Sequence, residues 1–68
     1  MIFIFKTNVD SISKVKKVSP KLNQLFPNSK WNFDLEDHDN ILRFECKDDI
    51  IEKVIFLMKV IGFECEAL

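Results

Sequence analysis

The sequence is poor in the residues that break regular structure: among its 68 residues there are one glycine and two prolines. Linkers and low-complexity segments are rich in such residues, so we expect none here. The apolar opening MIFIF is five residues long and has neither a basic lead nor a cleavage site, which predicts neither a signal peptide nor a membrane span. We therefore expect a single ordered domain, residues 1–68, that resides in the cytoplasm.

Residues that carry catalysis or bind metals are also scarce. The chain has one histidine, His38, and no set of serine, cysteine and histidine at the separations that nucleophilic catalysis needs, so we predict no enzyme activity. The two cysteines, Cys46 and Cys65, are nineteen residues apart without a CxxC pair, and they are expected to be buried thiols rather than a disulfide or a zinc site. Tyrosine is absent and the isoelectric point is near 5.7, which argues against a nucleic-acid partner.

Apolar residues follow two different periods along the chain. Period-two alternation predicts four strands, and spacings of three and four predict two helices. The first helix should begin at an N-cap on Asp10 or Ser11 and bend or restart at Pro20. The second follows a capping box at residues 49–52 and ends at Gly62. The predicted order is strand 1–7, a helical stripe over 15–25, strand 31–35, strand 42–46, helix 51–61 and strand 63–67.

Together these elements predict an α+β, ferredoxin-like fold. In a βαββαβ chain the two βαβ halves make right-handed crossovers and interleave. The expected product is a two-layer sandwich, in which a four-stranded antiparallel sheet of order 4-1-3-2 carries both helices on one face. The inward-facing residues form the predicted core, which consists of Phe3, Phe5, Val15, Val18, Leu22, Leu25, Trp31, Phe33, Leu35, Leu42, Phe44, Val54, Leu57, Met58, Ile61 and Phe63.

The segment after the first strand carries a resemblance to a known family. It is seen in KTN at residues 6–8, KV at 17–18, Pro20, Leu22, Asn23, Trp31, DLED at 34–37 and Leu42. Over essentially the whole chain, this pattern resembles the short heavy-metal-associated domains related to copper chaperones and to the N-terminal modules of metal-transporting ATPases. In metal-binding members the loop carries a CxxC pair that holds Cu(I) or another soft ion. The resemblance places those two positions at Ser11 and Lys14 here.

The exchange of ligands at these positions changes the expected chemistry. A serine hydroxyl is a hard, neutral donor, and a protonated lysine has no lone pair to give, so the usual copper or zinc site is predicted to be absent. The helix N-terminus, surrounded by Lys6, Lys14 and Lys17, should instead attract an anion or a carboxylate-bearing partner. The alternative is a copper or other soft-metal chaperone that binds its ion in a non-standard way, through Cys46, Cys65 or the turn at residues 36–39 around His38.

The charge distribution points to a binding surface. Residues 1–30 carry a net charge of +5 and residues 31–68 a net charge of −6. Three isoleucines, Ile2, Ile4 and Ile41, should lie on the uncovered sheet face, whereas Phe56 and Val60 should form an apolar ridge on the outside of the second helix. We therefore predict a non-catalytic module that binds a protein, either an acidic partner or a second copy of the chain, without membrane insertion. The residues expected to bind the partner are Lys6, Lys14, Lys17, Lys21, Phe56 and Val60.

Overall fold

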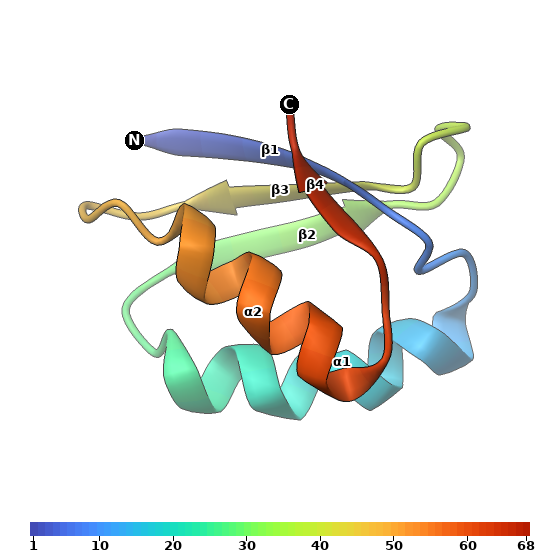
Figure 1. Ribbon diagram of the computed structural model, residues 1–68, viewed down its shortest axis with the longest axis horizontal. Helices are drawn as coiled ribbons and strands as arrows, with labels where there is room; N and C mark the ends of the chain where they lie inside the picture. The colour runs from blue at the N-terminus through green and yellow to red at the C-terminus, as the bar shows by residue number, and fades with distance from the viewer.

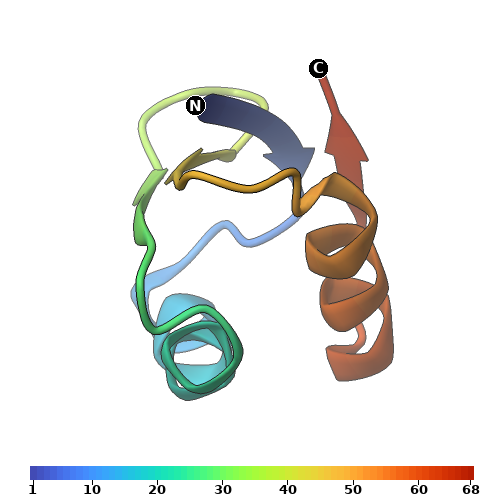
Figure 2. The same ribbon diagram turned by 90° about the vertical axis from the view of Figure 1, so that its left-hand side faces the viewer.

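The computed structural model describes residues 1–68 as one sheet with two helices (Figure 1). The elements are β1 Ile2–Thr7, α1 Ile12–Leu25, β2 Lys30–Asp34, β3 Ile41–Glu45, α2 Ile51–Ile61 and β4 Cys65–Ala67. The strands are antiparallel in the order β2-β3-β1-β4, and both helices lie on the same side of the sheet (Figure 2). This is the predicted order 4-1-3-2 read from the opposite edge of the sheet, so the predicted α+β ferredoxin-like fold and its strand order are confirmed. The longer helix, α1, has 14 residues, and neither helix is both long and apolar enough to cross a membrane.

The register of the strands places one row of large apolar side chains toward the helices. Phe3 and Trp31 both pair with Phe44, which lies between them on β3, and Phe5 pairs with Leu42 one row further along. Because successive side chains of a strand alternate between faces, these residues share the inner face of the sheet. Eleven buried residues form the core: Phe5, Val9, Val18, Leu22, Phe26, Leu42, Phe44, Ile50, Val54, Leu57 and Met58.

The core is smaller than the predicted one and differs from it where elements end. The predicted core residues that are only half-buried against it are Phe3, Val15, Trp31, Phe33, Ile61 and Phe63. Leu25 was expected inside but is 56% exposed, because α1 ends there and the chain turns so that Phe26 enters the core instead. Phe26 packs edge-to-face on Phe44, with ring centroids 5.3 Å apart. Leu35 lies in the turn after β2 rather than on the strand, and it is not among the residues packed on the core. Buried Val9 and Ile50 come from the loops that enter the helices.

The two helices begin differently, α1 with a side-chain cap and α2 without one. Ser11 is the N-cap of α1, as predicted, and α1 continues through the exposed Pro20 without a restart. The predicted capping box of α2 is wrong. The N-cap is Ile50, which makes no side-chain bond, and the carboxylate of Asp49 accepts the amide of Ile51 at 3.1 Å.

Gly62 ends α2 in the left-handed region, with φ of 107°, as the sequence predicts. Replacing it with alanine should lower the free energy of unfolding by about 1 kcal/mol, because a Cβ atom disfavours this backbone conformation. No neighbouring atom lies within 4 Å of the added Cβ, so the cost comes from the backbone alone. Urea denaturation checks the value. Gly62→Asn, whose side chain tolerates positive φ, should lose less, and an equal loss in both variants would contradict this account.

Candidate functional site

The loop between β1 and α1 is tied to two distant parts of the chain. The hydroxyl of Thr7 donates to the carbonyl of Asn40 at 2.6 Å and accepts the amide of Val9 at 3.1 Å. The side-chain carbonyl of Asn8 accepts the amide of Glu64 at 2.9 Å. The KTN segment therefore holds the β2–β3 turn and the start of β4 against this loop, which is a structural role that needs no ligand.

Ser11 and Lys14, the positions that correspond to the CxxC pair in the resemblance, already have partners. The Ser11 hydroxyl accepts the amide of Lys14 at 3.3 Å and lies 3.3 Å from the hydroxyl of Ser13. The Lys14 ammonium donates to the carboxylate of Asp10 at 2.7 Å. This hydrogen bond, and then the lysine's charge, lower the pKa of Asp10. One neutral oxygen and one ammonium do not fit a soft metal ion, which needs sulfur donors.

The three lysines expected to attract an anion to this loop also have partners within the chain. Besides the pair just described, Lys6 lies 3.5 Å from the carboxylate of Asp39, in the β2–β3 turn. The ammonium of Lys17 lies 5.8 Å from the centroid of the Phe63 ring, within the range of a cation–π contact. The structure thus distributes these lysines among separate partners rather than gathering them around the helix N-terminus.

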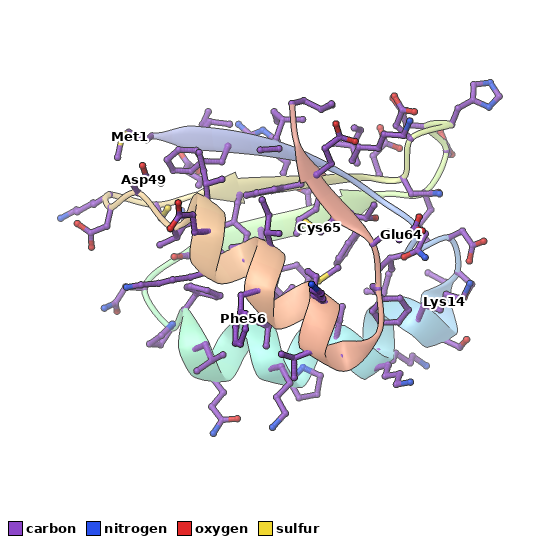
Figure 3. All side chains as sticks on the ribbon, in the orientation of Figure 1. Met1, Lys14, Asp49, Phe56, Glu64 and Cys65 are labelled. Atoms are coloured by element: carbon purple, nitrogen blue, oxygen red, sulfur yellow. The ribbon has the colours of Figure 1, made fainter.

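The two cysteines lie at opposite ends of the sheet. Cys65 pairs with Thr7 at the end of β1, whereas the amide of Cys46 donates to the carbonyl of Met1 at its beginning. Six residues of strand separate these points, a distance of about 20 Å at ~3.3 Å per residue. Figure 3 shows Met1 and Cys65 far apart. Both thiols are free and half-buried on the edge of the core, so they are less enclosed than predicted, and one chain cannot join them through a single ion.

Burial raises the pKa of the Cys65 thiol from 9.0 to about 11, which gives a testable pH dependence. Between about pH 9 and pH 11 the unfolded chain should hold fewer protons than the folded one, so the free energy of unfolding should fall as pH rises. The thiol is partly exposed, which limits the effect to the order of 1 kcal/mol. Urea denaturation across this range should show a smaller fall for Cys65→Ala than for the unchanged chain. Equal falls would contradict the assignment.

The turn at residues 36–39, the other expected metal position, uses its carboxylates for local structure. Asp37 accepts the amide of Asp39 at 2.8 Å, and Asp34 accepts the amide of Glu36 at 3.1 Å. His38 is exposed. Nowhere in the chain are three or more histidine, cysteine, aspartate or glutamate side chains grouped so that they could hold a metal ion.

Positive charge gathers on the helices and negative charge in the loops, whereas the four strands together carry no net charge. We call α1 and α2 together the helical layer. It contains six lysines and one acid, Glu52, and so carries a net charge of +5, whereas the strands and loops carry −6. The division predicted between the two halves of the chain is therefore, in the fold, a division between the helices and the loops. The lysines of the helical layer are Lys14, Lys16, Lys17, Lys21, Lys53 and Lys59.

An apolar groove opens within this basic layer. We call it the helical groove; it has a volume of about 520 Å³ and is lined by Leu25, Phe26, Lys53, Phe56, Leu57 and Val60. Phe56 and Val60 are 69% and 66% exposed, as the sequence predicts for an outward ridge. In Figure 3 Phe56 lies on α2 toward α1. The sequence did not identify Leu25, which was assigned to the core, or Lys53, whose position beside the groove depends on how the helices pack.

The opposite face of the sheet offers no comparable surface. Its isoleucines are interrupted, because each pairs with a charged residue on the neighbouring strand: Ile2 with Glu45, Ile4 with Arg43 and Ile41 with Asp34. A mixed face of this kind is ordinary for an antiparallel sheet with one solvated side. The helical layer is therefore the candidate interface.

Comparisons with family models, with curated proteins and with solved structures each find no match to this chain, so the candidate interface rests on its own geometry and charge.

Proposed function

We propose that this chain is a non-catalytic binding module that recognises a protein partner through its helical layer and works without the soft-metal site of the heavy-metal-associated domains it resembles. The observation that carries the proposal is the open apolar groove within a layer of net charge +5. Exposed apolar side chains that gather on one face favour association, and unpaired lysines around them favour a partner with carboxylates. We place this activity in the cytoplasm, as the composition suggests.

The chemistry of the loop after β1 supports a role other than metal transfer. Its residues at the two metal positions act as a helix cap and as half of an ion pair, and the cysteines are at opposite ends of β1. A metal carrier needs at least two soft donors that reach the same ion and can release it to another protein. If a protein binds through the helices, this loop is required only to hold α1 in place.

The proposal is tested by a charge reversal on each layer. The two matched variants are Lys21→Glu, on α1, and Arg43→Glu, on β3; both positions are exposed and neither residue belongs to an ion pair. Proteins captured by the immobilised chain from an extract of its own cells would be quantified by mass spectrometry. We expect a partner that is retained by Arg43→Glu, depleted by Lys21→Glu and released by added salt. Equal retention by both variants, or no specific capture, would overturn the proposal.

A further inference from the structure

The helical groove has the features of a site for a helix rather than for an extended peptide. Apart from the carbonyl of Lys16, which receives no amide from Pro20, the backbone groups along the middle of α1 and α2 are used within their own helices, so an extended chain lying in the groove would find no strand edge to pair with. A helix satisfies its own backbone and needs only side-chain contacts. Phe56 and Val60, one turn apart on α2, present apolar side chains at the spacing of the apolar stripe on an amphipathic helix.

The charges beside the groove indicate which residues should flank the apolar stripe of a bound helix. Lys53 lines the groove, and its ammonium has no ion-pair partner within the chain. The exposed lysines Lys21 and Lys59 lie on the two helices that form the groove and also lack such partners. We propose that the helical groove binds an acidic amphipathic helix of another protein, with apolar residues against Leu25, Phe56 and Val60 and a carboxylate at Lys53. This proposal rests on the proposed function and names the class of partner.

A second copy of the chain is a poorer occupant of the groove. A symmetric dimer would bring two helical layers together, each with a net charge of +5. A head-to-tail contact would place the sheet or the acidic loops of one copy on the groove of the next. The strands carry no net charge, the isoleucines on the outer face of the sheet each pair with a charged residue, and the acidic loops form no helix. The chain therefore contains no acidic helix that could fill its own groove.

A hollow beside the groove indicates where such a helix could extend. Leu25, Phe26 and Lys53 line both the groove and a second, more polar cavity of about 560 Å³ that runs toward the loop after β3. Its other lining residues include Asn28, Ser29, Lys47 and Asp48. The end of the bound helix near Lys53 would thus meet polar groups, whereas its middle would meet Phe56 and Val60.

The test uses a synthetic helical peptide of about four turns, or roughly 14 residues, with leucine at every third or fourth position and glutamate between them. A second peptide has lysine in place of each glutamate. Backbone amide signals of the protein would be followed by NMR during titration. We expect the acidic peptide to bind with micromolar affinity and to shift the signals of Leu25, Lys53, Phe56 and Val60. The lysine peptide should bind at least about tenfold more weakly.

Variants of the protein test which of its residues contact the acidic peptide. Lys53→Glu and Phe56→Ala should each weaken the acidic peptide about tenfold, whereas Arg43→Glu should leave its affinity unchanged. Equal binding of both peptides, or shifts confined to the sheet, would overturn the proposal. So would a failure of the acidic peptide combined with binding of phosphatidylserine vesicles, or concentration-dependent shifts of the groove in the absence of peptide, since these outcomes assign the groove to a lipid surface or to a second copy.

Failure of this inference is distinguishable from failure of the proposed function. If a captured partner still depends on Lys21 but not on Lys53 or Phe56, the helical layer binds its partner outside the groove, and only the assignment of the groove is wrong. If the acidic peptide binds as described while no cellular partner depends on the helical layer, the groove is a competent site but the proposed function is overturned.

Discussion

The double variant Ser11→Cys/Lys14→Cys should acquire Cu(I) binding, which we expect the unchanged chain not to show. Ser11 is the N-cap of α1, and its hydroxyl lies 3.3 Å from the amide of Lys14, so thiols at these positions would face each other at the helix N-terminus. That end of a helix stabilises thiolates, whose pKa there falls to about 3.5–7.5. Titration of the reduced protein against a competing chelator should show one-to-one uptake by the variant and no stoichiometric uptake by the unchanged chain.

The matched control for this experiment is Lys21→Cys/Gln24→Cys. These positions have the same spacing on α1 but lie in its C-terminal half, where the helix dipole disfavours thiolates. The control should bind Cu(I) more weakly than the N-terminal pair. Loss of the Ser11 cap should cost about 1 kcal/mol of stability, which is small enough for the variant to fold. If the N-terminal pair took up no more copper than the control, the loop would not share the geometry of the metal-binding loop that it resembles.

The fold could be predicted from the sequence because its apolar periods are regular over most of each element. Apolar and polar residues alternate strictly through β2 and over residues 42–45 of β3, and the stripe through Val54, Leu57 and Met58 identifies the buried side of α2. The misassigned residues lie where elements end. Leu25 continues the stripe of α1 in the sequence, yet the helix stops there, and the turn that follows directs Phe26 inward instead. Periodicity specifies the face of a residue only while the element continues.

The candidate site was less predictable because it depends on pairs of residues far apart in the sequence. Phe56 and Val60 could be assigned to the surface from α2 alone. Their combination with Leu25 in one groove required the packing of α1 beside α2, which no local pattern encodes. The partners of the loop lysines were hidden for the same reason, since Asp39 and Phe63 reach Lys6 and Lys17 only through the fold. The net charges of the two halves of the chain are +5 and −6, but these halves do not correspond to the parts of the fold on which the charges lie.

Phe44→Ala should remove most of the stability of the fold. Phe44 is fully buried on the central strand β3, between Phe3 and Trp31, and its ring packs against Phe26. Truncating a buried phenylalanine costs about 3–5 kcal/mol, whereas a chain of this length is stable by only about 3–10 kcal/mol. Urea denaturation followed by circular dichroism and by the emission of Trp31 should therefore show a much lower midpoint, or a variant unfolded without denaturant.

Phe56→Ala is the matched control, because it makes the same substitution at a side chain that is 69% exposed. It should change the free energy of unfolding by no more than about 0.5 kcal/mol. Phe44→Leu, which keeps part of the buried volume, provides a measurable intermediate if Phe44→Ala does not fold. Comparable losses for Phe44→Ala and Phe56→Ala would mean that Phe56 is covered in solution and that the helical groove is not open. A stable Phe56→Ala variant would instead allow any loss of partner binding to be assigned to the groove itself.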